Sequence, residues 1–462
     1  MKYVFYALIA IAFFAAAYQQ LFVWEAVSPD QQAVLIAAAE AAGEAVPDFT
    51  SPMDKLTGAA LDSAKASVTL AIGLIGGMSL FLGVMKVAEE GGLLQIIAKL
   101  LRPITVLLFP DVPANHPAMG AIILNMSANA LGLGNAATPF GIRAMQELDK
   151  LNPHKGTATN AMALFLAINT SALALLPTGV MVIRQEMGST DPGAIFPTTL
   201  VATCLSTLAG IVATKLYQRV WPSAATVHAQ ALASGEIPPE EREEPVASED
   251  DAALVDTSAY PLWVSAIAVV CLFSFVASLM IFRDLGQHVS PWVIPGILFG
   301  MLTFGMVRGV NVYAKLVEGA KAGWDVAVLI IPYLIAILVA VGMFRASGSM
   351  GVVTGVLGPF TNLVGLPPEA LPMALLRPLS GSGAYGIMMD ILRTEGPDSY
   401  TGLLVSTMQG STETTFYVLA VYFGAVQVKR IRHTMIAALT ADLFGIGGAI
   451  AAVWLMYGRA GL

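Results

Sequence analysis

The sequence that decides the fold is NMSANALGLGNAATP at residues 125–139, a polar, glycine-rich interruption in an otherwise apolar region. A second interruption, RPLSGSGAYG, occupies residues 377–386 in the other half of the chain. Each precedes a further polar break within a long apolar segment, NTS at 169–171 and QGSTETT at 409–415. Helix breaks persist at membrane depth only where protein or a water-filled cavity surrounds them. Breaks in corresponding positions of two halves indicate a binding site of the transporter type.

The composition also indicates a membrane protein. The 462 residues are 56% hydrophobic and 12% charged, whereas soluble domains have about 25% charged residues. Several segments reach the roughly 20 residues needed to cross hydrocarbon without any charge. They are 3–23, 66–85, 156–183, 192–214, 257–282 and 326–344. Residues 285–307, 399–428 and 434–458 are further candidates, the last two with one acid each. We therefore expect an all-α polytopic membrane protein.

The beginning of the chain allows two interpretations. Lys2, the apolar run after it and the small residues Ala15–Ala17 resemble a signal peptide. The apolar run continues to Trp24 and is longer than a usual signal core, so we favour an uncleaved first span.

An acidic segment divides the chain. Residues 222–258 hold nine acids against the single base Arg242, which matches the net charge of –8 of the whole chain. Such a composition is typical of a solvated, flexible linker, with a partner-binding segment as the alternative. We expect membrane halves at 1–221 and 259–462, joined by this linker.

The distribution of Lys and Arg predicts the orientation, because cytoplasmic loops retain positive charge. Residues 24–62 contain seven acids and one lysine and are expected outside, whereas the basic residues at 143–155 and 429–432 are expected inside. This places the N-terminus and the acidic linker in the cytoplasm and the C-terminus outside, in a multi-pass protein.

The same order of elements occurs in both halves: a span, a short amphipathic segment, a glycine-rich break and a long span with a polar break. In the first half these are 66–85, 90–110, 117–148 and 156–183, and in the second 326–344, 348–366, 370–393 and 399–428. The first span of each set is predicted to run in opposite directions. We therefore expect an inverted-topology repeat in which 117–148 and 370–393 form two re-entrant hairpins and the long spans are broken helices.

The breaks supply polar groups for a solute. In the first hairpin, Thr138 and Pro139 are expected to begin a helix at 139–149, whose free N–H groups and positive dipole end point into the break. In the second, glycines and serines precede a helix expected at 384–393. The candidate substrate-binding residues share amide, hydroxyl or guanidinium groups at the breaks; they are Asn125, Asn129, Asn135, Thr138, Asn169, Thr170, Ser171, Arg377, Ser380, Ser382, Gln409, Ser411 and Thr412.

One central acid stands out. Glu413 lies near the middle of 399–428, and burying such a charge costs at least ~2.5 kcal/mol, so an intramembrane acid is a functional candidate. We expect Glu413 and Thr414 to couple transport to H⁺ or Na⁺; a structural pair with Arg377 is the alternative. Asp442 lies nearer a membrane face and suits either function or a satisfied interhelical contact. Small and polar residues that merely pack helices together would explain single breaks but explain four matching ones poorly.

Other functions find little support. No histidine lies deep in a span to act as a base for Ser380 or Ser382, no metal-ligand spacing is present, and no phosphate-binding nucleotide motif occurs. We therefore expect no enzyme activity, no resident metal or cofactor beyond a coupling ion, and no nucleic-acid partner.

The motifs carry a family resemblance. Residues 129–139 (NALGLGNAATP) resemble the spore maturation protein A family, whereas RPLSGSG at 377–383, GPDS at 396–399 and QGSTETTFYVLAVYFG at 409–424 resemble the spore maturation protein B family. Both belong to the nucleoside recognition, or Gate, domain family, and the chain looks like a fusion of the two.

The resemblance implies a core similar to concentrative nucleoside transporters and to the membrane region of ferrous iron transport protein B. The iron interpretation is weakened because this chain has no GTPase domain and its cysteines lie outside the breaks. The hypothesis is an ion-coupled secondary transporter of a small polar or anionic solute, in the bacterial inner membrane, with a homodimer as the expected assembly. The alternative is a non-transporting receptor or assembly factor of the spore maturation type.

Overall fold

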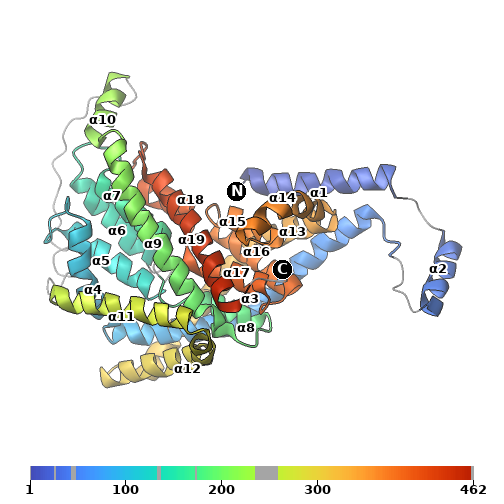
Figure 1. The fold of residues 1–462 in the computed structure, drawn as a ribbon, viewed down its shortest axis with the longest axis horizontal. Helices are drawn as coiled ribbons and strands as arrows, with labels where there is room; N and C mark the ends of the chain where they lie inside the picture. Colours follow the sequence, from blue (N-terminus) through green and yellow to red (C-terminus); the bar gives the residue numbers. More distant parts are fainter. Residues whose placement is uncertain are drawn as a thin grey trace.

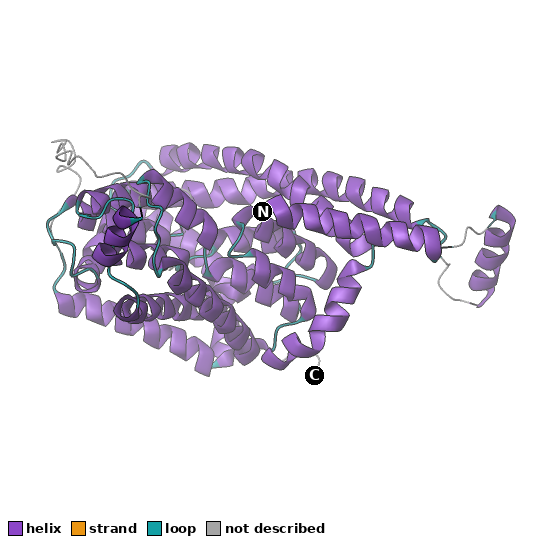
Figure 2. Ribbon diagram, turned by 90° about the horizontal axis from the view of Figure 1, so that it is seen from above, coloured by secondary structure: helices purple, strands orange, loops and turns teal. Residues whose placement is uncertain are grey.

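The computed structural model describes residues 2–24, 28–42, 48–132, 137–171, 174–234 and 259–458. These ranges are helical and contain no strand beyond one isolated pairing of Thr157 with Arg430, as Figure 2 shows. The helices of the first half are α1 (Lys2–Phe22), α2 (Pro29–Ala42), α3 (Pro52–Glu90), α4 (Leu93–Leu108), α5 (Pro117–Ala130), α6 (Ala137–Lys150), α7 (Asn160–Ser171), α8 (Thr178–Glu186), η2 (Pro192–Ala194), α9 (Ile195–Val220) and α10 (Ala224–Ala233).

The second half continues from α11, and Figure 1 shows its helices packed against those of the first. Its elements are α11 (Leu262–Ile281), α12 (Arg283–Val307), α13 (Val312–Ala346), α14 (Ser349–Thr361), η4 (Asn362–Val364), η5 (Pro368–Ala370), α15 (Leu371–Leu376), α16 (Gly381–Glu395), α17 (Tyr400–Ser411), α18 (Thr415–Ala425) and α19 (Thr434–Tyr457).

Seven helices within the described ranges are long and apolar enough to cross a membrane. They include α1, α3, α9, α11, α12, α13 and α19. A bent pair, Ser349–Val364 with Pro368–Leu376, turns by 101° and adds an eighth candidate. The expected all-α polytopic membrane protein is therefore confirmed. The expected long spans 156–183 and 399–428 are each divided into two helices, α7 with α8 and α17 with α18.

Two spans are longer than expected. The apolar stretch 66–85 lies within α3, which begins at Pro52, and 326–344 lies within α13, which begins at Val312. The expected external loop 24–62 therefore holds α2 and the first turns of α3. Ser51 explains the early start of α3, because its hydroxyl caps the N–H of Asp54 and proline follows at the first helical position.

Helices α3 and α13 pack side by side in opposite directions. Lys315 near the start of α13 pairs with Glu90 at the end of α3 at 3.1 Å. Along the same seam, Gly319 lies against Lys86, Gly323 against Ser79 and Gly342 against Ser63. A β-carbon on these three glycines would collide with α3, so the absence of a side chain lets the two helices approach closely.

The turns that follow the long helices α3 and α13 are similar to each other. Gly92 follows α3 with φ of 87°, and Gly348 follows α13 with φ of 75°, both in the left-handed region that favours glycine. In each half the chain then enters a shorter helix, α4 or α14. This repeated turn places a shorter helix beside the end of each long helix; α4 is amphipathic as expected, whereas α14 is apolar on all sides.

The buried core draws on both halves of the chain. One hydrophobic cluster combines α5, α6 and α7 with Leu419 and Phe423 of α18, and another combines α15, α16 and α17 with Val180 and Met181 of α8. Each of these clusters therefore joins helices of one half to the second piece of the broken helix in the other half. A smaller cluster lies within the first half and contains Met85, Leu94, Ala128, Leu131 and Ala137.

The acidic linker does not begin as an extended chain. Residues 224–233, within the expected linker 222–258, form helix α10, whose sequence AATVHAQALA is rich in good helix formers. The ring of His228 lies 5.2 Å from that of His154, between ring centroids. The acidic residues 236–256 lie outside the described residues. Helix α2 stands apart from the other helices in Figures 1 and 2.

Candidate functional site

Three asparagines form a buried amide cluster beside the first break. The amide of Asn125 donates to the Ala137 carbonyl at 2.9 Å, which ties α5 to the first residue of α6. The amide of Asn129 donates to the side chain of Asn169 at 3.0 Å, and Asn169 in turn donates to the Phe165 carbonyl at 2.9 Å. The cluster thus links the hairpin α5–α6 to the broken end of α7.

Tyr422 of α18 completes this cluster from the other half of the chain. Its hydroxyl lies 3.4 Å from the Asn125 amide and 3.5 Å from the Asn169 side-chain oxygen. A β-carbon on Gly141 would collide with this hydroxyl and with the Asn125 amide, so glycine in α6 makes the room. Tyr422 was missed from the sequence although it lies inside the motif at 409–424, because an aromatic residue in an apolar helix is usually core.

Arg377 organises the second break. Its side chain is 3% exposed, and it donates to the Thr414 hydroxyl at 3.1 Å, to the Gln409 carbonyl at 3.3 Å and to the Thr412 carbonyl. These carbonyls lose their helical partners where α17 ends, so the guanidinium satisfies them. Arg377 also lies 3.9 Å from the Glu413 carboxylate, whose side chain is 47% exposed. The pairing of Arg377 with Glu413, which the sequence analysis named as the alternative to an ion-coupling role, is therefore present at the rim of the break.

The helices that leave the breaks begin earlier than expected. Ser380 caps α16 by accepting from the Gly383 N–H at 3.1 Å, so that helix starts at Gly381 rather than at 384. Helix α6 is described from Ala137, so Thr138 and Pro139 lie in its first turn rather than at its start. Proline is tolerated there because N–H groups of the first turn have no intrahelical partner. Ser382, half-buried, lies in the first turn of α16.

The hydroxyls at the ends of α7 and α17 bond locally. Ser171, the last residue of α7, donates to the Ile168 carbonyl at 2.8 Å, and Ser411, the last of α17, donates to the Met408 carbonyl at 3.2 Å. Thr170 likewise donates to Ala167 at 3.0 Å. These hydroxyls close the final turns of the broken helices.

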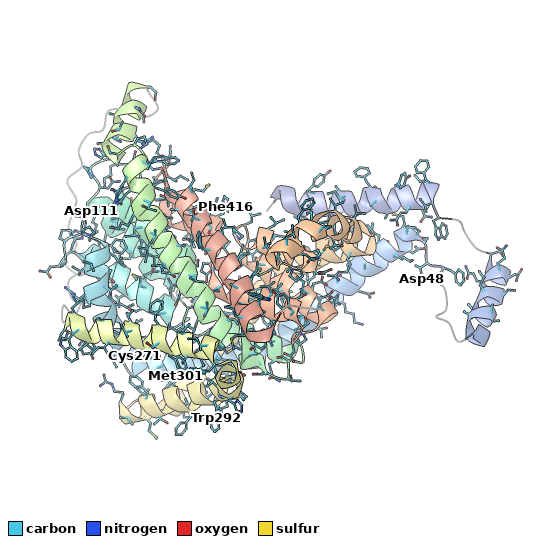
Figure 3. All side chains as sticks on the ribbon, in the orientation of Figure 1. Asp48, Asp111, Cys271, Trp292, Met301 and Phe416 are labelled. Atoms are coloured by element: carbon cyan, nitrogen blue, oxygen red, sulfur yellow. The ribbon has the colours of Figure 1, made fainter. Side chains whose placement is uncertain are left out.

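Backbone bonds bring the breaks of the two halves together. The N–H of Glu413 donates to the Thr170 carbonyl at 2.8 Å, so the break after α17 meets the break after α7. The Leu175 N–H donates to Ala130 at 3.0 Å, which joins the α7–α8 break to the end of α5. Figure 3 labels Phe416 in the first turn of α18, whose N–H donates to the Pro378 carbonyl at 3.0 Å. All four breaks therefore surround one region.

The sequence-derived candidates divide into three groups. One asparagine of the set, Asn135, lies outside the described residues. The side chain of Ser382 makes no hydrogen bond to the part of the chain that the structure describes. The remaining candidates are brought to the four breaks; they are Asn125, Asn129, Thr138, Asn169, Thr170, Ser171, Arg377, Ser380, Gln409, Ser411, Thr412, Glu413 and Thr414.

A cavity of about 910 Å³ opens beside α6. Its wall contains Thr138 at the break and charged residues further along α6, and it is closed opposite by Leu329 of α13 and Tyr417 of α18. The lining residues are Thr138, Pro139, Ile142, Arg143, Gln146, Glu147, Lys150, Leu329 and Tyr417. The lining therefore extends along α6 from the first break to the end of that helix.

The described residues contain no group of three or more His, Cys, Asp or Glu side chains that could hold a metal ion. The breaks instead offer amides, hydroxyls, carbonyls and one buried guanidinium. These groups suit hydrogen bonding to a solute better than tight coordination of a transition metal.

These features define a class: a polytopic helical membrane protein in which four helix breaks from two halves of the chain meet. The chain belongs to the nucleoside recognition, or Gate, family of the spore maturation proteins A and B. The family matches twice, over residues 68–189 and 327–429.

Two relatives in Bacillus subtilis (strain 168) support this membership. Spore maturation protein B is 45% identical over 172 residues, which cover 37% of this chain and 97% of that protein. Spore maturation protein A is 44% identical over 154 residues, which cover 33% of this chain and 79% of that protein. The expected resemblance to both proteins is thus confirmed. No solved structure matches the chain.

Proposed function

We propose that this membrane protein is a secondary transporter that moves a small polar or anionic solute by alternating access. The observation that carries the proposal is the meeting of the four breaks, joined by the bond from Glu413 to Thr170 and lined by the amide cluster and Arg377. Broken helices around a polar region near the middle of the bilayer are the usual construction of a transporter binding site.

We also propose that the two halves, 1–221 and 259–462, form an inverted-topology repeat with re-entrant hairpins α5–α6 and α15–α16. The antiparallel packing of α3 and α13 supports it, since these are the first spans of the two sets. Further support comes from the two family matches, which begin at residues 68 and 327 within those spans. Ser171 and Ser411 close the broken helices in the same manner.

The chemistry of the breaks favours a solute with several hydrogen-bonding groups. The amides of Asn125, Asn129 and Asn169 offer both donors and acceptors, as a heterocyclic base or a sugar requires. The N-termini of α6 and α16 direct partial positive charge into the breaks, and Arg377 adds a full one. A nucleoside-like or anionic metabolite belongs to this class of solute.

Coupling to an ion is proposed for the second break. Glu413 and Thr414 lie at the end of α17, where Arg377 holds the threonine hydroxyl and faces the carboxylate. A proton or Na⁺ bound there would change the charge that the solute meets.

The cavity beside α6 is the proposed entry route, because it leads from Thr138 to Lys150. The positive-inside pattern favours a cytoplasmic Lys150, and we propose that the N-terminus lies inside and the C-terminus outside a bacterial inner membrane. The pairing of Thr157 with Arg430 supports this orientation, since it brings the two basic loops expected inside to one face. A homodimer in the bilayer is the proposed assembly.

A second candidate, a non-transporting receptor or assembly factor, is favoured by the names of the two relatives. In that case the acidic linker would carry the partner, and its deletion would abolish function. We propose no covalent chemistry, since the oxygen of Ser380 is engaged in capping α16.

Uptake by purified protein in proteoliposomes tests the transport proposal. A panel of nucleosides, carboxylates and phosphorylated metabolites is presented with an inward Na⁺ or H⁺ gradient. We expect gradient-dependent uptake of at least one solute, and its loss in Arg377→Gln. Arg393→Gln is the matched control, because that arginine lies on α16 away from the break and is half exposed. Uptake of no solute under either gradient would overturn the proposal.

A further inference from the structure

Asp442 is a buried carboxyl inside the last span, and no function above uses it. It lies on α19, is 3% exposed, and accepts a hydrogen bond from the Thr415 hydroxyl at 2.6 Å through Oδ2. Its other oxygen, Oδ1, is also buried and has no hydrogen-bond partner among the described residues. An ionised carboxylate in this state is costly, because a buried charge requires pairing or full hydrogen bonding.

The position of Asp442 connects it to the breaks. Thr415 is the first residue of α18, so the carboxyl touches the helix that leaves the second break. One turn further along α19, a β-carbon on Gly445 would collide with Thr412, so α19 lies directly against the break itself. Ser206 of α9 donates to the Ala441 carbonyl at 2.8 Å and holds this part of α19 against α9.

Few charged groups face Asp442. Arg377 is the cation that acts on it across the break, and Arg377 is already occupied by Thr414 and two carbonyls. Helix α7 carries no titratable side chain, and Lys215 of α9 donates to the Leu108 carbonyl instead. The other titratable side chains on helices that pack against α19, or at its ends, are Cys204, Tyr217, Arg219, Cys271, Tyr400, Tyr417, Tyr422, His433 and Tyr457.

Glu413 lies in a different setting. Its side chain is 47% exposed and lies 3.9 Å from Arg377, so it is not enclosed by protein as Asp442 is. A group that binds and releases a proton during a transport cycle needs a state in which the proton is favoured. Asp442 offers such a state, because it is enclosed by protein and its Oδ1 has no hydrogen-bond partner among the described residues.

We propose that Asp442 is a further proton-carrying site, beside the ion site proposed at Glu413 and Thr414, and that it holds a proton when the breaks are closed and releases it when α18 moves away from α19. The inference rests on the transport function proposed above. Thr415 suits this role because a hydroxyl can donate to the carboxylate or accept from the acid. The Asp442–Thr415 contact therefore survives both protonation states, with its direction reversed.

Infrared spectroscopy of the full chain in lipid nanodiscs tests the assignment, since a protonated carboxyl has a C=O stretch that a carboxylate lacks. We expect this band in the wild type near neutral pH and its complete loss in Asp442→Asn. Glu413→Gln, the matched acid-to-amide control at the neighbouring break, should retain it. Thr415→Val should move the band to higher frequency, because a hydrogen bond to the carboxyl is removed.

Three results would overturn the assignment: no band at any pH, a band that persists in Asp442→Asn, or a band that NaCl but not choline chloride removes. The last would mean that Asp442 is ionised and binds Na⁺. If Asp442→Asn fails to fold, Asp442→Glu keeps the test open, since the band should remain at a shifted frequency. The spectrum can be recorded without any solute, so the two proposals can fail separately. If the Asp442 band is present but no solute is taken up, only the transport function is contradicted. If proton-driven uptake occurs without the band, only the assignment of Asp442 is contradicted.

Discussion

At the scale of single residues, the two breaks are held by side chains of different chemistry. The first depends on amides that bond to one another, and the second depends on one buried guanidinium that satisfies carbonyls at the end of α17. The residue types at the breaks were predictable, because polar groups in apolar sequence are conspicuous. Tyr422 and Asp442 were not assigned to the site, because their partners Asn125 and Thr415 become neighbours only after folding.

Gly141 gives a direct test of the packing around the amide cluster. We expect Gly141→Ala to lower the free energy of unfolding by about 1–3 kcal/mol, because the new methyl group would meet the Tyr422 hydroxyl and the Asn125 amide. Thermal unfolding in detergent measures the change. Gly447→Ala is the control, since nothing lies within 4 Å of that position. Equal stability of the two variants would contradict the close contact.

His433, just before α19, predicts a pH dependence. Burial, together with the nearby Arg432, lowers the pKa of its imidazole to about 4. The unfolded chain, with a pKa near 6.5, then binds a proton that the folded chain does not, so stability falls as pH drops from about 6.5 towards 4. The loss should be on the order of 3 kcal/mol, and His433→Gln should remove most of it. Chemical denaturation across pH measures this; a pH-independent difference between the two proteins would contradict it.

At the scale of elements, hydropathy predicted where helices exist but not how far they extend. The apolar core of α3 was evident at 66–85, whereas its polar first turns from Pro52 carry no hydrophobic signal. Helix α16 begins at Gly381, before the predicted residue 384, because the Ser380 cap outweighs the low helix propensity of glycine. Helix α6 likewise includes Ala137, before the predicted residue 139. The division of two long spans was predictable, since polar clusters interrupt them.

The antiparallel register of α3 and α13 can be tested by cross-linking. In a background of Cys204→Ala and Cys271→Ala, we expect Glu90→Cys with Lys315→Cys to cross-link readily, because these side chains form a 3.1 Å ion pair. Glu90→Cys with Arg345→Cys is the control and should not react, since Arg345 lies at the opposite end of α13. Gel mobility after a short bis-thiol reagent measures both. The reverse pattern would contradict the antiparallel packing.

At the scale of the whole molecule, an ion pair joins the two halves at the end opposite the Thr157–Arg430 contact. Arg184, completely buried, lies 2.8 Å from Asp398, which also accepts from Ser189 at 2.6 Å and from the Thr190 N–H at 2.8 Å. Burial opposes ionisation of Asp398, but these hydrogen bonds and the charge of Arg184 outweigh it and hold its pKa below the usual value. While Asp398 is ionised, these contacts hold the loop after α8 against the loop before α17.

We expect Asp398→Asn to destabilise the protein by about 1–3 kcal/mol at neutral pH, because Arg184 loses its counter-charge. A lowered carboxyl pKa contributes stability that is fully present above the ordinary aspartate value and is lost as pH falls through the folded value. The difference between wild type and variant should therefore stay constant from neutral pH to about pH 4 and shrink below it. Denaturation at several pH values measures this. A difference that shrinks already between pH 7 and 5 would contradict it.

The proposed transport cycle requires that the breaks be accessible from only one side of the membrane at a time. Thr138 tests it most directly, because it lies at the break and lines the cavity beside α6. Thr138→Cys, in the background without Cys204 and Cys271, is treated with a membrane-impermeant maleimide from each side of the bilayer, with and without a transported solute. We expect labelling from the cytoplasmic side, and we expect a saturating solute to slow this labelling or to shift it to the other side. Labelling from neither side, or labelling that no solute alters, would contradict it.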